Sequence, residues 1–102
     1  MAHKYHAQPE YLDGYRFASR KEALRYVQLR ALQRGGQIHG LELQPSYDLH
    51  VGKIKVGRYV ADFCYREGEQ VIVEDVKGMR TPLYRLKKKM VEAEHGFVVR
   101  ET

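Results

Sequence analysis

Apolar residues recur at the three- and four-residue spacing of an amphipathic helix in the first third of the chain. Ser19 and Glu22 match a capping box, in which a hydroxyl at the N-cap is followed three residues later by a carboxylate. Gly35 and Gly36 end the pattern, because glycine commonly terminates helices. We therefore expect a helix between Ser19 and Gly35. Its apolar face would consist of Ala23, Leu24, Val27, Ala31 and Leu32.

A second helical pattern begins at Thr81 and Pro82, a capping hydroxyl followed by proline at the first helical position. Gly96 ends this helix, and residues 97–100 predict a final short strand. The apolar stripe of the helix would consist of Leu83, Leu86, Met90 and Ala93. Its basic side chains would lie mostly away from that stripe: Arg85, Lys87, Lys88 and Lys89.

Three stretches between the helices have the patterns of β-strands. Residues 41–49 alternate between apolar and polar, and Pro45 either bends this strand or places it at the edge of a sheet. Residues 50–57 are expected to form a basic turn before a second strand at 58–65. Residues 70–77 are apolar on both faces until their carboxylates appear, which predicts a central strand.

The order helix, three strands, helix, strand predicts an α/β (α+β) domain. A chain of 102 residues supports one modest core, so residues 19–102 are expected to form a single domain. Residues 1–18 are polar and aromatic and are broken by Pro9 and Gly14. They are expected to form an N-terminal arm with one short strand.

The charge balance favours a polyanionic partner. Lysine and arginine number 18 against 13 acidic residues, which gives a net charge of +5. Nucleic acid is the simplest such partner, although a mildly basic protein without one has the same composition. A single cysteine, Cys64, excludes an internal disulfide framework and a cysteine-based zinc site. No apolar run approaches the length of a membrane span or a signal peptide, so we expect a cytoplasmic protein without a membrane partner.

Two aspartates and a lysine are the candidate catalytic groups. Asp75 and Lys77 are two residues apart on a predicted strand and so share a face, and Asp62 lies on the preceding strand. Two carboxylates beside an ammonium could hold a divalent metal and hydrolyse a phosphodiester. Asp62 could instead cap a turn, and Lys77 could be a surface lysine. Glu74 points to the opposite face and is expected to be solvated or salt-bridged.

On the second and third strands of an αβββαβ unit, Asp62 and Asp75-x-Lys77 resemble the motif of the PD-(D/E)xK nuclease superfamily. Longer stretches resemble a small phage-encoded endonuclease-like family within it, from about Lys4 onward. These stretches are Tyr15-Arg16-Phe17-Ala18-Ser19-Arg20-Lys21-Glu22-Ala23, Leu43-Gln44-Pro45, Ala61-Asp62-Phe63-Cys64-Tyr65, Glu74-Asp75-Val76-Lys77-Gly78 and Thr81-x-x-Tyr84-x-x-Lys87.

The resemblance implies a restriction-endonuclease-like αβββαβ core, with a central mixed sheet flanked by helices. It implies that Mg²⁺ is the cofactor and that Mn²⁺ can substitute, with no organic cofactor. The metal ligands would be the carboxylates of Asp62, Asp75 and Glu22 and the carbonyl of Val76, and Lys77 would complete the catalytic set. The capping box explains Glu22 without any catalytic role, so both interpretations of that residue stay open.

Several polar and basic residues are candidate DNA contacts. Amides at a helix N-terminus and nearby cations bind phosphate, which favours the start of the second helix. A second basic group lies near the glycine turn, and a solvated surface is the alternative for every member. The candidates are Gln44, Lys53, Lys55, Arg58, Thr81, Tyr84, Arg85 and Lys88.

The expected function is that of a Mg²⁺-dependent DNA endonuclease acting on structured or branched DNA in phage DNA metabolism, similar to a Holliday-junction resolvase. It would work in the host cell cytoplasm. Cleaving two strands needs two active sites, which implies a homodimer. A non-catalytic nucleic-acid-binding or assembly protein that retains the nuclease fold is the alternative. Nothing in the sequence separates DNA from RNA as the substrate.

Overall fold

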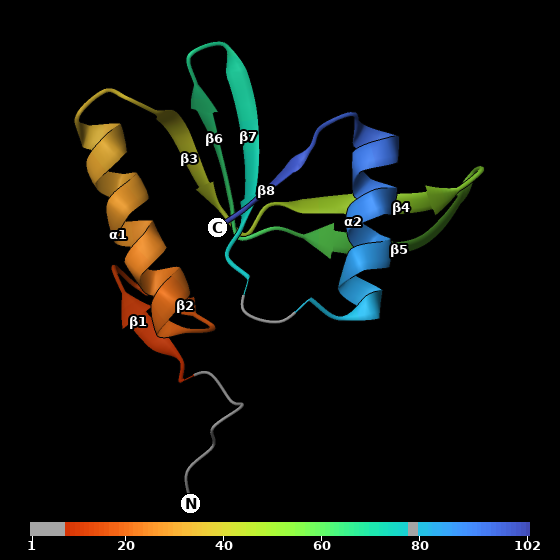
Figure 1. The fold of residues 1–102 in the computed structure, drawn as a ribbon, viewed down its shortest axis with the longest axis horizontal. Coiled ribbons are helices and arrows are strands. Elements are labelled where there is room, and N and C mark those ends of the chain that lie inside the picture. Colours follow the sequence, from red (N-terminus) through yellow and green to blue (C-terminus); the bar gives the residue numbers. More distant parts are fainter. Residues whose placement is uncertain (1–7, 78–79) are drawn as a thin grey trace, which may run out of the picture.

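A computed structural model describes residues 8–77 and 80–102 of the chain, and Figure 1 shows their arrangement. The described part is an α+β fold, as the sequence predicted. Its elements are β1 (Glu10–Leu12), β2 (Tyr15–Phe17), α1 (Arg20–Arg34), β3 (His39–Leu43), β4 (Ser46–Val51), β5 (Ile54–Val60), β6 (Phe63–Glu67), β7 (Gln70–Asp75), α2 (Pro82–His95) and β8 (Val99–Glu101).

A mixed four-stranded sheet forms the centre of the molecule, with the strand order β3-β6-β7-β8. β3 and β7 each pair antiparallel with β6. β8 pairs parallel to β7, with Val73 opposite Val99 and Asp75 opposite Glu101. A parallel neighbour needs a crossover connection, and α2 supplies it. β7 therefore has a partner on each side, which confirms its predicted central position.

The first two predicted strands are each broken into two. Gln44 has a left-handed φ of 52°, and it separates β3 from β4 together with Pro45, which has no amide hydrogen. Ala61 and Asp62 separate β5 from β6. The two breaks face each other, because Gln44 N–H donates to the Asp62 carbonyl (2.9 Å) and Ala61 N–H to the Pro45 carbonyl (3.0 Å). Pro45 thus bends the chain, and Asp62 lies at the bend.

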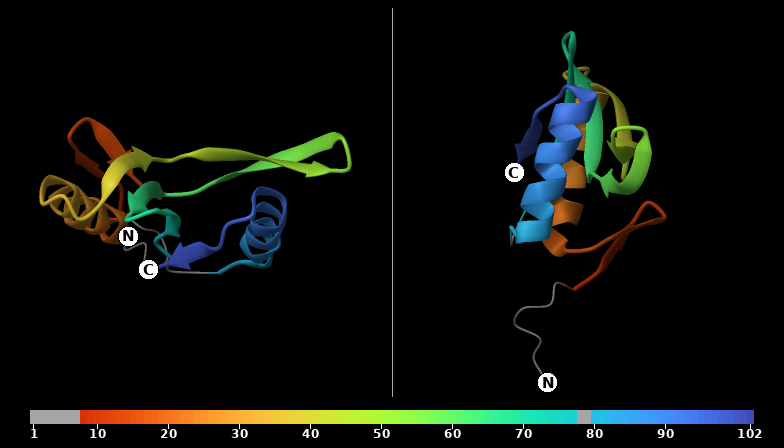
Figure 2. Two further views of the ribbon diagram at one scale, coloured as in Figure 1. Left: turned by 90° about the horizontal axis from the view of Figure 1, so that it is seen from above. Right: turned by 90° about the vertical axis from the view of Figure 1, so that its right-hand side faces the viewer.

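Beyond the bend, β4 and β5 form an antiparallel arm that leaves the central sheet (Figures 1 and 2). The predicted turn at 50–57 was wrong. The turn contains only Gly52, with a φ of 59°, and Lys53. Pairing shifts from Leu49 opposite Gly57 to His50 opposite Lys55, so β5 has one extra residue, which forms a β-bulge. The residues predicted to form a turn are therefore part of a bulged strand.

The described part of the N-terminal segment forms a hairpin, β1 and β2, instead of an arm with one strand. Asp13 and Gly14 turn the chain with φ angles of 51° and 82°. The Phe17 ring is buried 5.0 Å from that of Tyr26 on α1, and the Tyr26 hydroxyl donates to Asp13 (2.7 Å). Burial of an aromatic ring holds this segment on the helix.

Both helices have the predicted caps, with Ser19 Oγ accepting from Glu22 N–H and Thr81 Oγ1 from Tyr84 N–H, each at 3.1 Å. The predicted apolar face of α1 was partly wrong. Ala23 is buried and Leu32 packs on the core, but Leu24 and Val27 are 55% and 41% exposed. The other buried side chains of α1 are those of Glu22, Tyr26 and Leu29.

The predicted stripe of α2 was also partly wrong. Leu83 and Leu86 are 61% and 56% exposed, whereas Tyr84, Met90 and Val91 pack inward. Lys88 is not on the solvent face as expected, because it is partly buried in an ion pair with Glu92 (3.1 Å). Helical periodicity allows more than one face in both helices, and contacts with the sheet select among them.

The sheet separates two apolar cores. One lies under α1 and includes Phe17, Leu29, Ile38, Phe63 and Tyr65. The other lies between α2 and the β4–β5 arm and includes Leu49, Tyr59, Val73, Val91 and Val99. On β7, Ile72 belongs to the first core and Val73 to the second, so this strand lies between the cores. In the part of the chain that the structure describes, neither helix is long and apolar enough to cross a membrane.

Candidate active site

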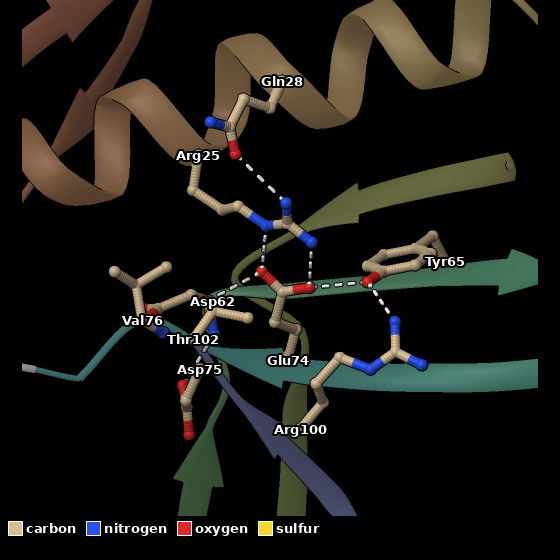
Figure 3. Close-up of polar contacts among 9 residues, drawn as sticks. All are labelled: Arg25, Gln28, Asp62, Tyr65, Glu74, Asp75, Val76, Arg100 and Thr102. Carbon is tan, nitrogen blue, oxygen red and sulfur yellow. Dashed lines mark hydrogen bonds and ion pairs between the residues drawn. The ribbon is translucent and has the colours of Figure 1, made fainter. Parts of the chain in front are cut away.

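At the end of β7, Asp62 is hydrogen-bonded both to Asp75 and to the residue that follows it, Val76. Asp62 N–H donates to Asp75 Oδ1 (3.0 Å), and Val76 N–H donates to Asp62 Oδ2 (2.7 Å). The bend between β5 and β6 makes this possible, because it places Asp62 beside the last residue of the neighbouring strand. Figure 3 shows the three residues together. The structure thus ties the amide of Val76 to the site, while ligation by its carbonyl stays a prediction.

The second oxygen of Asp75 has no hydrogen-bond partner within the described residues. The side chain is 1% exposed, and its Oδ2 atom lies 4.0 Å from Lys77 Nζ, a distance too long for a hydrogen bond. Burial raises the pKa of this carboxyl, against the opposing effects of the Lys77 charge and the Asp62 amide. A buried acceptor without a donor costs free energy, so it indicates either a functional group or a missing partner.

Glu22 reaches the same place from the first turn of α1. It is 6% exposed, and its carboxyl lies close enough to that of Asp62 for each to affect the pKa of the other. Burial, and then the charge of Asp62, raise the pKa of Glu22 to about 7. Its amide serves the Ser19 cap while its carboxyl faces the site. The two interpretations of Glu22 are therefore compatible.

Both the backbone and the side chain of Lys77 make contacts that hold the residue in place. Its carbonyl accepts from Lys21 Nζ (2.9 Å), and its amide donates to the Thr102 carbonyl (3.1 Å). The ammonium lies 4.1 Å from the centre of the Tyr84 ring, within reach of a cation–π contact. Its charge opposes the raised pKa values of Glu22, Asp62 and Asp75. The structure therefore brings all four predicted catalytic side chains into one cluster.

Glu74 points away from this cluster, as Figure 3 shows, and is fully buried. Arg25 donates to both of its oxygens, at 2.6 and 2.9 Å. The Tyr65 hydroxyl (2.5 Å) and the Thr102 hydroxyl (3.2 Å) donate as well. Burial acts to raise the pKa of Glu74, but these donors lower it below its usual value. Glu74 is the salt-bridged carboxylate that the sequence analysis expected.

Within the described residues, no group of three or more histidine, cysteine, aspartate or glutamate side chains is arranged to hold a metal ion. The chemistry of the donors nevertheless fits one. Glu22 and Asp62 are neighbouring carboxyls whose pKa values are raised by burial, and Asp75 has a buried oxygen without a hydrogen-bond partner among the described residues. Hard oxygen donors of this kind suit Mg²⁺, which needs only one or two carboxylates because it retains several waters.

The predicted DNA-contacting residues fall into separate groups. Thr81, Tyr84 and Arg58 line a cavity of about 380 Å³ together with Tyr59, Val60, Leu83 and Lys87. Lys53 lies in the turn at the far end of the β4–β5 arm, and Lys55 pairs with Asp48 (3.2 Å). The expected patch of Lys53, Lys55 and Arg58 is thus divided.

The other three candidates lie elsewhere. The Gln44 amide is bonded to the carbonyl of Asp62, while its side chain is exposed at the bend. Arg85 is exposed on the first turn of α2, and Lys88 is engaged by Glu92. The structure therefore does not bring these residues together with the cavity group.

Five supporting residues were not assigned a role by the sequence analysis: Lys21, Arg25, Tyr65, Glu101 and Thr102. The spacing of Arg25, one turn after Glu22, was the only available signal. Glu101 accepts from the Tyr84 hydroxyl (2.7 Å) and from Arg80 Nε (3.1 Å), which connects β8 to the start of α2.

Comparison with protein families gives one match. The family model described as "Protein of unknown function (DUF1064)" matches residues 2–100, almost the whole chain. No curated protein matches the chain, and no solved structure matches it either.

Proposed function

We propose that this chain, which belongs to the DUF1064 family, is a Mg²⁺-dependent DNA endonuclease of the PD-(D/E)xK type. The observation that carries the proposal is the buried, unpartnered Oδ2 of Asp75 beside the Glu22–Asp62 carboxyl pair and Lys77. Glu22 comes from α1, Asp62 from the bend before β6 and Asp75 from the end of β7, and the charge of Lys77 acts on all three carboxyls. Such an arrangement is unfavourable without a cation and useful with one.

The contrast with Glu74 supports a catalytic role. Glu74 and Asp75 are adjacent on β7 and equally buried. Glu74 accepts four hydrogen bonds, whereas Asp75 accepts one on Oδ1 and none on Oδ2 within the described residues. The fold is thus able to satisfy a buried carboxylate at this place. The unsatisfied neighbour is then better explained by binding than by stability.

Glu22, Asp62 and Asp75 would hold the metal, and Mn²⁺ would replace Mg²⁺ because it uses similar oxygen ligands. When bound, the metal would lower the pKa of a coordinated water and polarise a phosphoryl oxygen. Lys77 would offset the negative charge that develops on the phosphate. Lys21 and Thr102 position Lys77 through its backbone, and Tyr84 limits the motion of its ammonium.

The substrate we propose is structured or branched DNA, as in Holliday-junction resolution, in phage DNA metabolism and hence in the host cytoplasm. The net charge of +5 suits a polyanion. A domain of this size would read the DNA backbone and shape more than sequence. Cutting both strands requires two sites, and a homodimer would provide them.

The second candidate is a nucleic-acid-binding or assembly protein that retains the fold without catalysis. It is favoured by the lack, in residues 8–77 and 80–102, of three side chains already arranged around a metal. RNA remains an alternative substrate for the catalytic proposal.

One panel separates these functions. Linear, nicked, single-stranded and four-way-junction DNA, and a matching RNA, are incubated with the protein in EDTA, Mg²⁺ or Mn²⁺. The proposal predicts metal-dependent cleavage, fastest on the junction. Binding to the DNA without cleavage in any metal would favour the second candidate. Cleavage of RNA but not of DNA would mean that the substrate is RNA.

A further inference from the structure

We propose that the cavity between β5 and the first turns of α2 binds one nucleoside monophosphate unit of the substrate, next to the phosphate that is cleaved. The cavity has a volume of about 380 Å³, which is within the range of small-molecule sites. This inference rests on the proposed function for the identity of the substrate.

Tyr84 connects the cavity to the catalytic cluster. Its ring contributes to the cavity wall, and the same ring lies 4.1 Å from Lys77 Nζ. Its hydroxyl is fixed by Glu101 at 2.7 Å. A nucleic-acid strand with one phosphate at Lys77 would therefore place the adjoining nucleotide against Tyr84.

Two cations from different elements line this cavity, Arg58 on β5 and Lys87 on α2. Neither has a carboxylate within ion-pair distance in the described part of the chain, whereas Lys55 and Lys88 are both paired. Cations that lack internal partners and border one cavity favour a phosphate group. The N-terminus of α2, capped by Thr81, adds the positive end of a helix dipole.

The rest of the lining suits a sugar or a base. Val60 and Leu83 are 48% and 61% exposed, and the rings of Tyr59 and Tyr84 are 6.4 Å apart. The Tyr59 hydroxyl has no hydrogen-bond partner among the described residues. An inorganic anion would make no favourable contact with the apolar part of this surface, whereas a nucleotide has both an apolar ring face and a phosphate. The cavity therefore fits a complete nucleotide unit.

The test uses the metal-free protein in EDTA, so that it does not depend on cleavage. Thymidine 5′-monophosphate, thymidine and inorganic phosphate are titrated into labelled protein, and amide shifts are followed by NMR. We expect the monophosphate to shift the signals of Arg58, Leu83, Tyr84 and Lys87 at lower concentration than either fragment does. Shifts confined to other surfaces, or equal potency of phosphate alone, would overturn the proposal.

Variants give a second test. Arg58→Gln and Lys87→Gln should each weaken monophosphate binding by about threefold to fivefold, as expected for one exposed ionic contact. Lys89→Gln removes the same charge from an exposed position on α2 outside the cavity, and should have no specific effect. Leu83→Ser should weaken binding of the monophosphate but not of phosphate, and the fold should tolerate it because Leu83 is exposed.

These outcomes are separable from the proposed function. Monophosphate binding at the cavity without cleavage of any nucleic acid would leave the cavity assignment standing and reject the nuclease. The opposite result is also possible to detect. If wild type cleaves DNA, and if Arg58→Gln and Lys87→Gln both cleave DNA and bind the monophosphate as Lys89→Gln does, the nucleotide site at the cavity is rejected and the nuclease proposal stands.

Discussion

The guanidinium of Arg25 on α1 contacts both carboxylate oxygens of Glu74 on β7, with Nε 2.6 Å from Oε2 and Nη2 2.9 Å from Oε1. This ion pair fixes the helix against the central strand. Glu22 lies one turn earlier on the same helix, and Asp75 follows Glu74 on the strand. The pair therefore sets the relation between the two elements that carry the catalytic acids.

Arg25→Met is expected to lower the free energy of unfolding by about 3–5 kcal/mol, because it leaves the buried Glu74 carboxylate without its cation. Denaturant unfolding measures this loss. Arg30→Met is the matched control, since Arg30 pairs with Asp13 at an exposed position and its removal should cost far less than that of Arg25. Equal losses for the two variants would show that the Glu74 pair does not hold α1.

The metal-free protein should lose stability as the pH rises from 5 to 8. The folded-state pKa of Glu22 is raised to about 7, so folding favours its protonated form. Stability from this proton is present below the ordinary carboxyl pKa and is lost as the pH rises through about 7. The full effect would be about 2–3 kcal/mol.

Glu22→Gln should reduce that pH dependence, as measured by urea unfolding in EDTA at pH 5 and pH 8, and the remainder would come from Asp62 and Asp75, whose pKa values are also raised by burial. Glu69→Gln, an exposed change in the β6–β7 turn, serves as the control. An unchanged slope in Glu22→Gln would contradict the assigned pairing of Glu22 with Asp62.

Mg²⁺ or Mn²⁺ should raise the Tm of the wild type, because ligands that bind only the folded state stabilise it. Asp75→Asn should abolish that increase while keeping the bond from the Asp62 amide to its Oδ1 position. A thermal scan with and without millimolar metal measures both effects. A metal-dependent increase that survives in Asp75→Asn would remove Asp75 from the ligand set.

Lys77→Met should slow cleavage by about 10²- to 10³-fold, as expected for loss of a group that stabilises developing charge. Unfolding is measured beside cleavage, because the variant also removes the cation that lies 4.0 Å from the buried Asp75 carboxylate. Single-turnover rates give the comparison, with Lys89→Met at an exposed position on α2 as the control. Similar rates in the two variants would mean that Lys77 is not catalytic.

Local signals in the sequence predicted much of this fold. Ser19 and Thr81 identified the helix starts because capping depends on neighbouring residues. The doubly apolar pattern of β7 identified the central strand because both its faces are buried. The spacing of Asp75 and Lys77 placed them correctly in one cluster with Asp62.

The remainder depended on contacts that sequence neighbours do not reveal. The bend at Gln44 depends on a left-handed backbone conformation, with positive φ, which residues other than glycine seldom adopt. The inward faces of the helices were misassigned at Leu24 and Leu83 because both helices carry more than one apolar stripe. Arg25 and Glu74 are far apart along the chain, and neither residue alone predicts the other.

The most direct test of the central claim is the rate of Mg²⁺-dependent cleavage of a four-way DNA junction by wild type, Asp75→Asn and Asp48→Asn. Asp48 is an exposed aspartate on the β4–β5 arm, so its variant controls for the loss of a negative charge. We predict cleavage by wild type and Asp48→Asn at similar rates, and none by Asp75→Asn. Cleavage by Asp75→Asn at the wild-type rate, or no cleavage by wild type, would contradict the account.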